Sequence, residues 1–352
     1  MDDDAKPRPQ ATQLEVARLA GVSQRTVSNV VSGRGQVSAE LASRVREAIE
    51  TLGYVPSHAA RSLRSGRSGV LQLIVPELDV PYFAELGREM IKRASERGFS
   101  VMVQQTLGSD QREYEALNGP VGSFAEGTVL SAVGSAPAVW PSRQTRAPLV
   151  LIGETRRTGV LDHIGIDDSA ASKAATQHLI AVGARRVGFI GAHTDGDLPM
   201  AQMRTAGFAA ALREAGLSLD PQLVAATNAY HRKDGEEAMS RLLALERPPD
   251  AVFCATDLLA LGALRSAHEL GISVPDDLVV MGFDGLEEGQ YSVPTLSTVA
   301  PDKAALAEMC IERLLTRVEA HRLGSHEPAP EDLTVPFSLV ARESTRRIQQ
   351  SA

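Results

Sequence analysis

Residues 12–64 read TQLEVARLAGVSQRTVSNVVSGRGQVSAELASRVREAIETLGYVPSHAARSLR, and this stretch decides the fold of the first part of the chain. Thr12 with Glu15 three residues later is the capping-box pattern of a helix start. Gly21 is placed to end this helix, and Ser23 is placed to cap a second one. Two helices joined by a short turn that contains glycine indicate a helix-turn-helix.

The second helix is expected to have one buried face and one exposed face. Val27, Val30 and Val31 are spaced i, i+3 and i+4, which places them on one apolar side. In the major groove, arginine pairs with guanine, whereas glutamine and asparagine pair with adenine. The residues that point away from the valines are therefore suited to recognising bases: Gln24, Arg25, Ser28 and Asn29.

A third helix and a short last helix are expected next. Ser38 is placed to cap the third helix and Gly53 to end it, and Ser57 is placed to cap the last one. A plain helical bundle without a DNA-binding role is the alternative. The density of arginine on the exposed faces favours DNA binding.

The charge distribution supports the same interpretation. The 352-residue chain has a formal net charge of −8. Residues 11–68, however, hold eight Arg against four Asp or Glu, whereas residues 69–352 hold 26 Lys or Arg against 37 Asp or Glu. A basic end on an acidic body is expected when only that end contacts phosphates.

From Gly69 onward, short apolar runs alternate with helical patterns. The alternation predicts an α/β fold with parallel sheets covered on both faces, and its length favours two lobes over one. Ligands of such folds bind beyond the carboxyl ends of the strands. The expected strands are VLQLIV, SVMVQQT, GTVLSAV, PLVLIGE, RVGFIGA, AVFCATD and LVVMGFD, and the expected helices are 170–182, 204–215, 233–245 and 258–270, with one irregular helix in 108–124.

These stretches together resemble the lactose-repressor (LacI/GalR) family of transcription regulators. In the head, the resemblance rests on VARLAGVSQRTVSNVVSG and VSAELASRVREAIETLGYVPSHAARSLRSG, which follow the family pattern without gaps. In the body, it rests on VPYFAEL, MRTAGF, FCATDLLALGALRSAHELGISVPDDLVVMGFDG and PTLSTVAPD. The resemblance implies an N-terminal all-α helix-turn-helix head and a two-lobed core like that of periplasmic binding proteins, with a cleft between the lobes.

The same resemblance sets the expected domain boundaries. They are a disordered tail (1–10), the head (11–56), a hinge (57–68), the effector-binding core (69–346) and a short tail (347–352). Lobe 1 is expected over about 69–165 and 299–328, and lobe 2 over about 166–298 and 329–346.

In this family the second helix enters the major groove and the hinge helix pushes a leucine into the minor groove, so the resemblance assigns that role to Leu63. An apolar wedge beside Arg61 and Arg64 is suited to bending DNA, and packing of Leu63 on the core is the alternative. Asn29 stands where relatives often carry arginine, which favours a base recognised by an amide. The residues expected to contact DNA are Thr12, Ser23, Gln24, Arg25, Thr26, Ser28, Asn29, Ser57, Ala60, Arg61, Leu63 and Arg64.

For the cleft, the resemblance implies that Arg204 and Asp284 hold a small-molecule effector. A carboxylate accepts from two hydroxyls, a guanidinium donates to two oxygens, and an aromatic face covers the C–H side of a ring, so these residue types suit a sugar. A purine or nucleoside is the alternative effector. The expected effector-binding residues are Tyr82, Phe83, Glu154, Arg204, Tyr230, Thr256, Asp257 and Asp284.

Several of these residues also have a purely structural interpretation. Arg204 and Asp284 could form an interlobe salt bridge, and Tyr230 could serve in packing within its lobe. For Asp257, capping of the helix that follows it is favoured over contact with a ligand. The scattered histidines, among them His193 and His231, are expected to be solvated.

The sequence contains no GxSxG, P-loop, HExxH or Cys/His cluster, so neither catalysis nor a cofactor or metal is expected. The expected function is a ligand-responsive transcription repressor. A soluble sugar-binding protein and an enzyme on the same fold are the alternatives from other classes.

The expected location and assembly complete the prediction. The start MDDDAKPRPQ lacks the apolar core of a signal peptide, and no apolar run is long enough to span a bilayer, which predicts a cytoplasmic protein. The resemblance implies a homodimer on a near-palindromic operator. A tail without leucine heptads after Ile348 favours a dimer over a tetramer.

Overall fold

The head is a three-helix unit whose helix ends follow from local side-chain chemistry. The computed structural model describes residues 11–32, 35–54, 67–133, 147–153, 159–193 and 198–346. At the start of α1 (Gln13–Ala20), the Thr12 hydroxyl accepts from the Glu15 backbone N–H, and the Glu15 carboxylate accepts from the Thr12 backbone N–H. Gly21 then ends α1 in the left-handed region, at φ 62°.

The head's other two helices, α2 (Gln24–Ser32) and α3 (Ala39–Leu52), close a small apolar core with α1. Arg44 of α3 donates from Nη2 to the Ala20 carbonyl at 2.5 Å, so it ties α3 to the last turn of α1. A Cβ at position 21 would lie 2.6 Å from that same nitrogen, so Arg44 would have to shift to admit a side chain there. The buried core of the head is Val16, Ala17, Ala20, Val27, Val45 and Ala48.

The chain divides into two units, 1–68 and 69–352, and the second unit carries two sheets. All strand pairs of the first sheet are parallel, in the order β11-β5-β4-β3-β1-β2. Its strands are β1 (Val70–Val75), β2 (Ser100–Gln105), β3 (Gly127–Ser131), β4 (Leu149–Ile152), β5 (Asp162–Gly165) and β11 (Asp332–Thr334).

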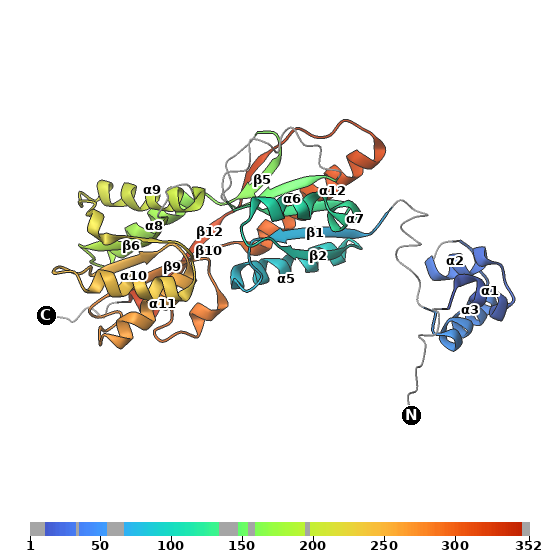
Figure 1. Cartoon of the computed structure of the whole chain (residues 1–352), viewed down its shortest axis with the longest axis horizontal. Coiled ribbons are helices and arrows are strands. Elements are labelled where there is room, and N and C mark those ends of the chain that lie inside the picture. The colour runs from blue at the N-terminus through green and yellow to red at the C-terminus, as the bar shows by residue number, and fades with distance from the viewer. Residues whose placement is uncertain are drawn as a thin grey trace, which may run out of the picture. The chain divides into compact units, whose positions relative to one another are not determined.

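Helices cover both faces of this first sheet (Figure 1). Alternation along β1 places Leu71, Leu73 and Val75 in one apolar cluster and Ile74 in another, on opposite faces. The first face packs against α5 (Pro81–Glu96) and α12 (Lys303–Leu323), and the second against α6 (Asp110–Asn118), which α7 (Pro120–Phe124) adjoins.

The second sheet has the order β12-β10-β9-β8-β6-β7 and is parallel except for the edge pair β10 and β12. Helices α8 and α9 lie on one of its faces, and α10 and α11 on the other (Figure 1). Its elements are β6 (Val187–His193), β7 (Val224–Thr227), β8 (Ala251–Cys254), β9 (Val279–Phe283), β10 (Ser297–Pro301), β12 (Phe337–Val340), α8 (Asp168–Ala181), α9 (Pro199–Glu214), α10 (Arg232–Leu243) and α11 (Asp257–Glu269), with short 3-10 turns at Pro221–Leu223, Glu287–Gln290 and Glu343–Thr345.

The predicted two-lobed α/β core with parallel sheets is confirmed, although β5, β7, β10, β11, β12 and helix α12 were not predicted. Three predicted features also differ locally. Residues 108–124 form two helices instead of one, because Pro120 starts a new helix directly after Gly119. Helix α9 begins at Pro199, five residues before the predicted start at Arg204. Strand β11 pairs with β5 of the first sheet, although the predicted boundaries put it in lobe 2.

None of the helices within the described ranges is long and apolar enough to cross a membrane. The hinge residues Ser57, Ala60, Arg61, Leu63 and Arg64, the two predicted tails and Glu154 lie outside the described residues.

Candidate functional site

Helix α2 presents polar side chains on the side away from the head core. Val27 is fully buried, whereas Gln24 and Arg25 are exposed and Ser28 and Asn29 are half-buried. The helix starts as the sequence predicts, because the Ser23 hydroxyl accepts from the Thr26 backbone N–H at 3.1 Å, and the Ser23 and Thr26 hydroxyls are 2.9 Å apart. No carboxylate lies in its first turn, so the positive end of the helix dipole is not offset there.

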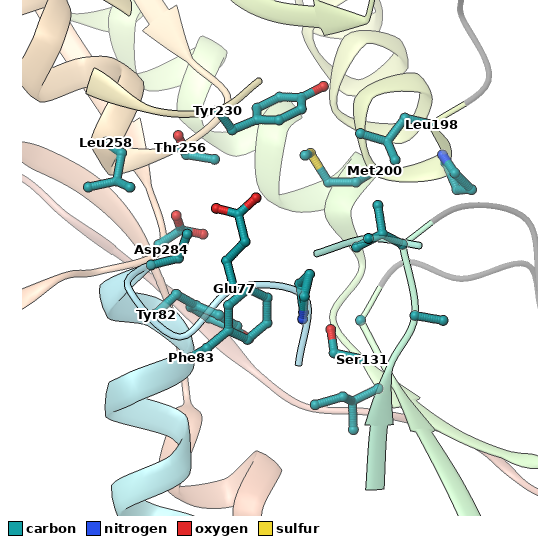
Figure 2. Close-up of a pocket in the computed structure, with 18 of the residues that line it drawn as sticks. Glu77, Tyr82, Phe83, Ser131, Leu198, Met200, Tyr230, Thr256, Leu258 and Asp284 are labelled. Carbon is teal, nitrogen blue, oxygen red and sulfur yellow. The ribbon is translucent and has the colours of Figure 1, made fainter. Parts of the chain in front are cut away.

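In the second unit, a cavity of about 380 Å³ lies where the carboxyl ends of both sheets meet. From the first lobe, Glu77 follows β1 and Ser131 ends β3; from the second, His193 ends β6 and Thr256 follows β8. Figure 2 shows that side chains from both lobes point into this space. The position agrees with the general rule for ligand sites in parallel α/β sheets.

Asp284, which directly follows β9, is held in an unusual backbone conformation. Its φ of 119° lies in a region that residues other than glycine rarely adopt, and such residues cost about 1–3 kcal/mol each. The turn is held from both sides: the Asp284 N–H donates to the Val299 carbonyl at 2.8 Å, and Lys303 Nζ donates to the Asp284 carbonyl at 2.5 Å. The strained turn places the Asp284 side chain on the cavity wall.

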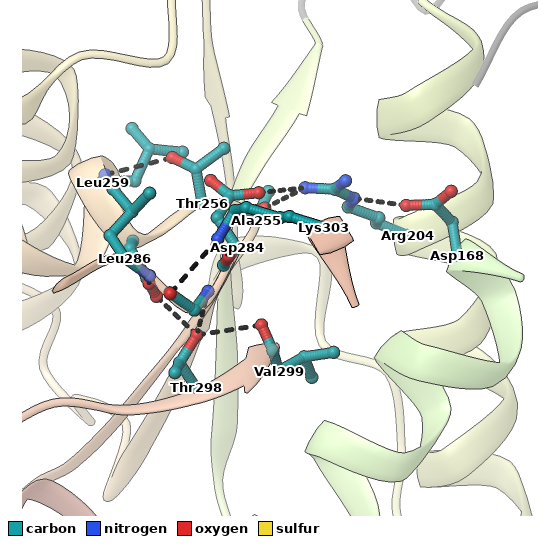
Figure 3. A network of polar contacts seen from close by, with 12 residues as sticks. Asp168, Arg204, Ala255, Thr256, Leu259, Asp284, Leu286, Thr298, Val299 and Lys303 are labelled. Atoms are coloured by element: carbon teal, nitrogen blue, oxygen red, sulfur yellow. Dashed lines mark hydrogen bonds and ion pairs between the residues drawn. The ribbon is translucent and has the colours of Figure 1, made fainter. Parts of the chain in front are cut away.

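Arg204 lies between two carboxylates, as Figure 3 shows. Its Nε donates to Asp168 at 2.7 Å, and its Nη1 lies 3.9 Å from an Asp284 oxygen and donates to the Ala255 carbonyl. The guanidinium also stacks over the Phe283 ring, 3.6 Å from the ring centroid. Only 5% of the Arg204 side chain and 1% of the Asp168 side chain are exposed, so this is a buried ion pair that borders the cavity.

Asp257 is buried behind the cavity wall and is not among the residues that line the cavity. One of its oxygens accepts from the Leu286 N–H and the other from the Thr298 hydroxyl, each at 2.7 Å. Complete burial, with the nearby Asp284 charge as a second cause, raises the pKa of Asp257 well above its usual value. Asp257 therefore fixes the turn that carries Asp284.

Aromatic side chains cover the cavity from both lobes. Tyr82 and Phe83, at the start of α5, contact each other edge to face with ring centroids 5.3 Å apart. Tyr230 lines the opposite wall, and its hydroxyl donates to the Gly191 carbonyl at 3.2 Å. Burial raises the pKa of Tyr230 to about 12, so its hydroxyl remains a hydrogen-bond donor throughout the physiological pH range.

Two sets of polar contacts connect the lobes beside the cavity. Glu77 of the first lobe lies 3.2 Å from His231 of the second, and both residues line the cavity. Glu85 of α5 accepts from the Glu287 N–H of the second lobe at 3.0 Å and pairs with Lys303 at 2.9 Å. Lys303 therefore joins the first lobe directly to the Asp284 turn.

Comparison with known proteins identifies the family of this chain. Residues 12–57 match the model of bacterial regulatory proteins of the lacI family, and residues 176–345 match the model of the periplasmic binding protein-like domain. The HTH-type transcriptional repressor CytR of Escherichia coli (strain K12) is 30% identical over 346 residues, which cover 97% of this chain and 98% of that protein.

The chain belongs to the LacI family of bacterial regulatory proteins. The resemblance predicted from the sequence is confirmed. Because the family consists of DNA-binding transcription regulators, this LacI-family chain is not an enzyme, and its matched head distinguishes it from a plain solute-binding protein.

Solved structures of LacI-family proteins are also similar. A transcriptional regulator of the LacI family from Sanguibacter keddieii DSM 10542 is 41% identical with a TM-score of 0.73, over 80% of this chain and 99% of that one. A complex of the transcriptional regulator CelR with cellobiose is 28% identical with a TM-score of 0.70, over 95% of this chain and 100% of that one.

Most of the residues predicted for the cleft of this LacI-family chain lie on the cavity wall, and two structural interpretations prove wrong. Arg204 and Asp284 both belong to the second lobe, so they do not form an interlobe salt bridge. The cap of α11 is Thr256, whose hydroxyl accepts from the Leu259 N–H at 3.2 Å, and not Asp257. The predicted residues that line the cavity are Tyr82, Phe83, Arg204, Tyr230, Thr256 and Asp284.

Sequence reasoning missed Glu77, His193 and His231 as lining residues of the cavity. The two histidines were expected to be solvated, yet the Nδ1 atom of His193 is buried and finds no hydrogen-bond partner among the described residues. The strand pattern could have indicated two of them, because ligand sites lie beyond the carboxyl ends of parallel strands. Glu77 comes two residues after the first apolar strand, and His193 ends a later one.

Proposed function

We propose that this protein is a transcription repressor whose effector is a sugar that binds between the two lobes. The observation that carries the proposal is a cavity that combines a carboxylate (Asp284), a guanidinium (Arg204) and aromatic rings from both lobes. Its chemistry fits a polyol, because the carboxylate accepts from hydroxyls while the rings cover the C–H face.

Further features of the wall support a sugar. Thr256 and Ser131 add hydroxyl groups that can both donate and accept. The similar CelR structure was solved with a sugar, cellobiose, bound.

For the head, we propose that α2 lies in the major groove and that Gln24, Arg25 and Asn29 contact bases. The exposed side chains and the absence of a carboxylate in the first turn of α2 support this placement. Thr12, Ser23, Thr26 and Ser28 would contact the backbone or neighbouring bases, and two heads of a homodimer would bind a near-palindromic operator. A repressor of this kind acts on DNA in the cytoplasm.

The hinge would transmit the effector signal to the heads. We propose that Leu63, between Arg61 and Arg64, enters the minor groove, with Ser57 capping the hinge helix and Ala60 beside the DNA. A helix this short is marginal alone, so its order would depend on DNA and on the partner hinge. Leu63→Ala is expected to weaken operator binding strongly and to leave calorimetric ligand binding unchanged; equal operator affinity in a gel-shift titration would rule out the wedge.

Titration calorimetry of the full chain with sugars and nucleosides tests the effector proposal. We expect a sugar to bind the parent protein and to fail to bind the Asp284→Ala variant. Binding of a nucleoside with no response to any sugar would replace the sugar with the alternative effector. The control is Asp79→Asn, an exposed carboxylate in the loop after β1 that does not line the cavity.

A further inference from the structure

The charges that face the cavity indicate which net charge the effector can carry, in addition to whether it is a sugar or a nucleoside. Among the described residues that line it, Arg204 is the one side chain with a permanent positive charge, whereas Glu77 and Asp284 carry carboxylates. In Figure 2, the carboxyl groups of Glu77 and Asp284 both point into the pocket, one from each lobe.

The positive charge of Arg204 is already matched within the second lobe. Its Nε donates to Asp168, and its Nη1 donates to the Ala255 carbonyl and faces Asp284. Two of its five N–H groups donate in these contacts, and Asp284 lies 3.9 Å from the same Nη1, so its charge is largely offset before an anion could approach. Its charge is also offset by two carboxylates that lie on either side of it.

The nearby basic side chain of Lys303 does not reverse this balance. Lys303 does not line the cavity, and its ammonium group pairs with Glu85 and donates to the backbone carbonyls of Asp284 and Gly285. Asp257 does not line the cavity either, and its burial raises the pKa of its carboxyl well above the usual value.

Two histidines, His193 and His231, also line the cavity. His231 lies 3.2 Å from the Glu77 carboxylate. Asp168 and Asp284 outnumber Arg204. Among the described groups around the cavity, the carboxylates of Glu77, Asp284, Asp168 and Glu85 therefore outnumber the permanent positive charges of Arg204 and Lys303.

We infer that the cavity takes an uncharged or cationic polyol and rejects phosphorylated and carboxylated ones, with Glu77 as a specificity-determining residue. This inference rests on the proposed sugar effector and specifies the charge that the sugar carries. The apolar part of the wall agrees with it, because burial of a phosphate among Phe83, Ile152 and Leu306 would cost its hydration, and the described part of the wall offers no permanent positive charge besides Arg204.

Titration calorimetry of the full chain against matched ligands tests the inference. The sugars are glucose, galactose and cellobiose, each with its amino, uronic-acid and 6-phosphate derivatives. The nucleosides are cytidine and adenosine, each with its 5′-monophosphate. We expect a neutral or amino sugar to bind roughly 100-fold more tightly than its phosphate.

The Glu77→Gln variant should bind the anionic derivative about tenfold more tightly than the parent protein does and change affinity for the neutral sugar less than threefold. Asp79→Asn is the matched control, because it removes the same charge from the same loop at an exposed position outside the cavity. It should leave both affinities unchanged. Equal effects of the two substitutions would overturn the role of Glu77.

The outcomes separate this inference from the proposed function. A sugar phosphate or uronate that binds as tightly as its parent sugar overturns the charge class and leaves the sugar effector standing. A nucleoside that binds while sugars and its monophosphate do not overturns the sugar effector and leaves the charge class standing. If no ligand of the set binds, both are contradicted.

Discussion

Replacement of Arg204 by methionine should affect two properties that can be measured separately, stability and ligand response. The substitution keeps an unbranched apolar stem but removes the guanidinium that pairs with Asp168 at 2.7 Å. Because Asp168 is 1% exposed, it would be left as a buried carboxylate without this partner. Loss of one partner of a buried ion pair costs about 3–5 kcal/mol.

The same reasoning predicts a rescue. In Arg204→Met with Asp168→Asn, no carboxylate remains at position 168, so most of the lost stability should return, to within about 1–2 kcal/mol of the parent. The ligand response should not return, since the guanidinium is still missing from the cavity wall. A role limited to ligand binding would predict no stability loss in either variant.

Differential scanning calorimetry of the purified chain measures the first property. For a unit of this size, the single variant should unfold roughly 10 °C below the parent and the double variant within a few degrees of it. Calorimetric titration with the effector measures the second. The explanation fails if the single variant unfolds at the parent's temperature, or if the double variant is as unstable as the single one.

Three further predictions follow from other contacts. Burial raises the pKa of Glu113 to about 7. The protein should therefore lose about 3 kcal/mol of stability as pH rises from 4.5 to 7, because the folded state holds this proton to a higher pH than the unfolded state does. Urea unfolding at pH 5 and pH 8 should show this loss in the parent but not in Glu113→Gln, and equal pH dependence of the two would contradict it. Lys303→Met should weaken effector binding about tenfold by loosening the Asp284 turn, and an unchanged Kd in calorimetry would show that the turn holds without it. Thr256→Val should lower stability by about 1 kcal/mol through loss of the α11 cap, whereas Thr256→Ser should keep it; equal losses in thermal unfolding would argue against the cap.

The parts of the fold that could be predicted are those that local chemistry controls. Thr12 with Glu15, Gly21 and Ser38 mark helix ends in the head, and the structure has those caps. The seven predicted apolar runs are all strands. Six of them are largely buried, which explains their apolar character, whereas β2 is an edge strand without a fully buried residue. The helix-turn-helix head followed from the same signals.

The parts that could not be predicted depend on contacts between distant residues. Thr256 and Asp257 are adjacent and both can cap a helix, and only the donors Leu286 N–H and Thr298 hydroxyl decide that Asp257 faces inward. The assignment of β11 to the first sheet depends on its pairing with β5, which no local pattern encodes.

The candidate site was predictable as a region but not as a set of contacts. Strand ends indicated the cavity, and the resemblance supplied Arg204 and Asp284. The partners of Arg204 were not visible, since Asp168 belongs to another helix and Ala255 contributes only a backbone carbonyl. In the same way, nothing local to Glu77 or His231 indicated that they face each other across the cavity.

The central claim is that occupancy of the cavity changes the affinity of the head for DNA. The most direct measurement selects DNA sites from genomic fragments with the full chain and then titrates a selected site with and without the effector identified by calorimetry. We expect a near-palindromic site and a ligand-dependent change in DNA affinity of roughly 5- to 150-fold, which Asp284→Ala abolishes without loss of DNA binding. A ligand that saturates the cavity and leaves the DNA affinity unchanged would contradict it.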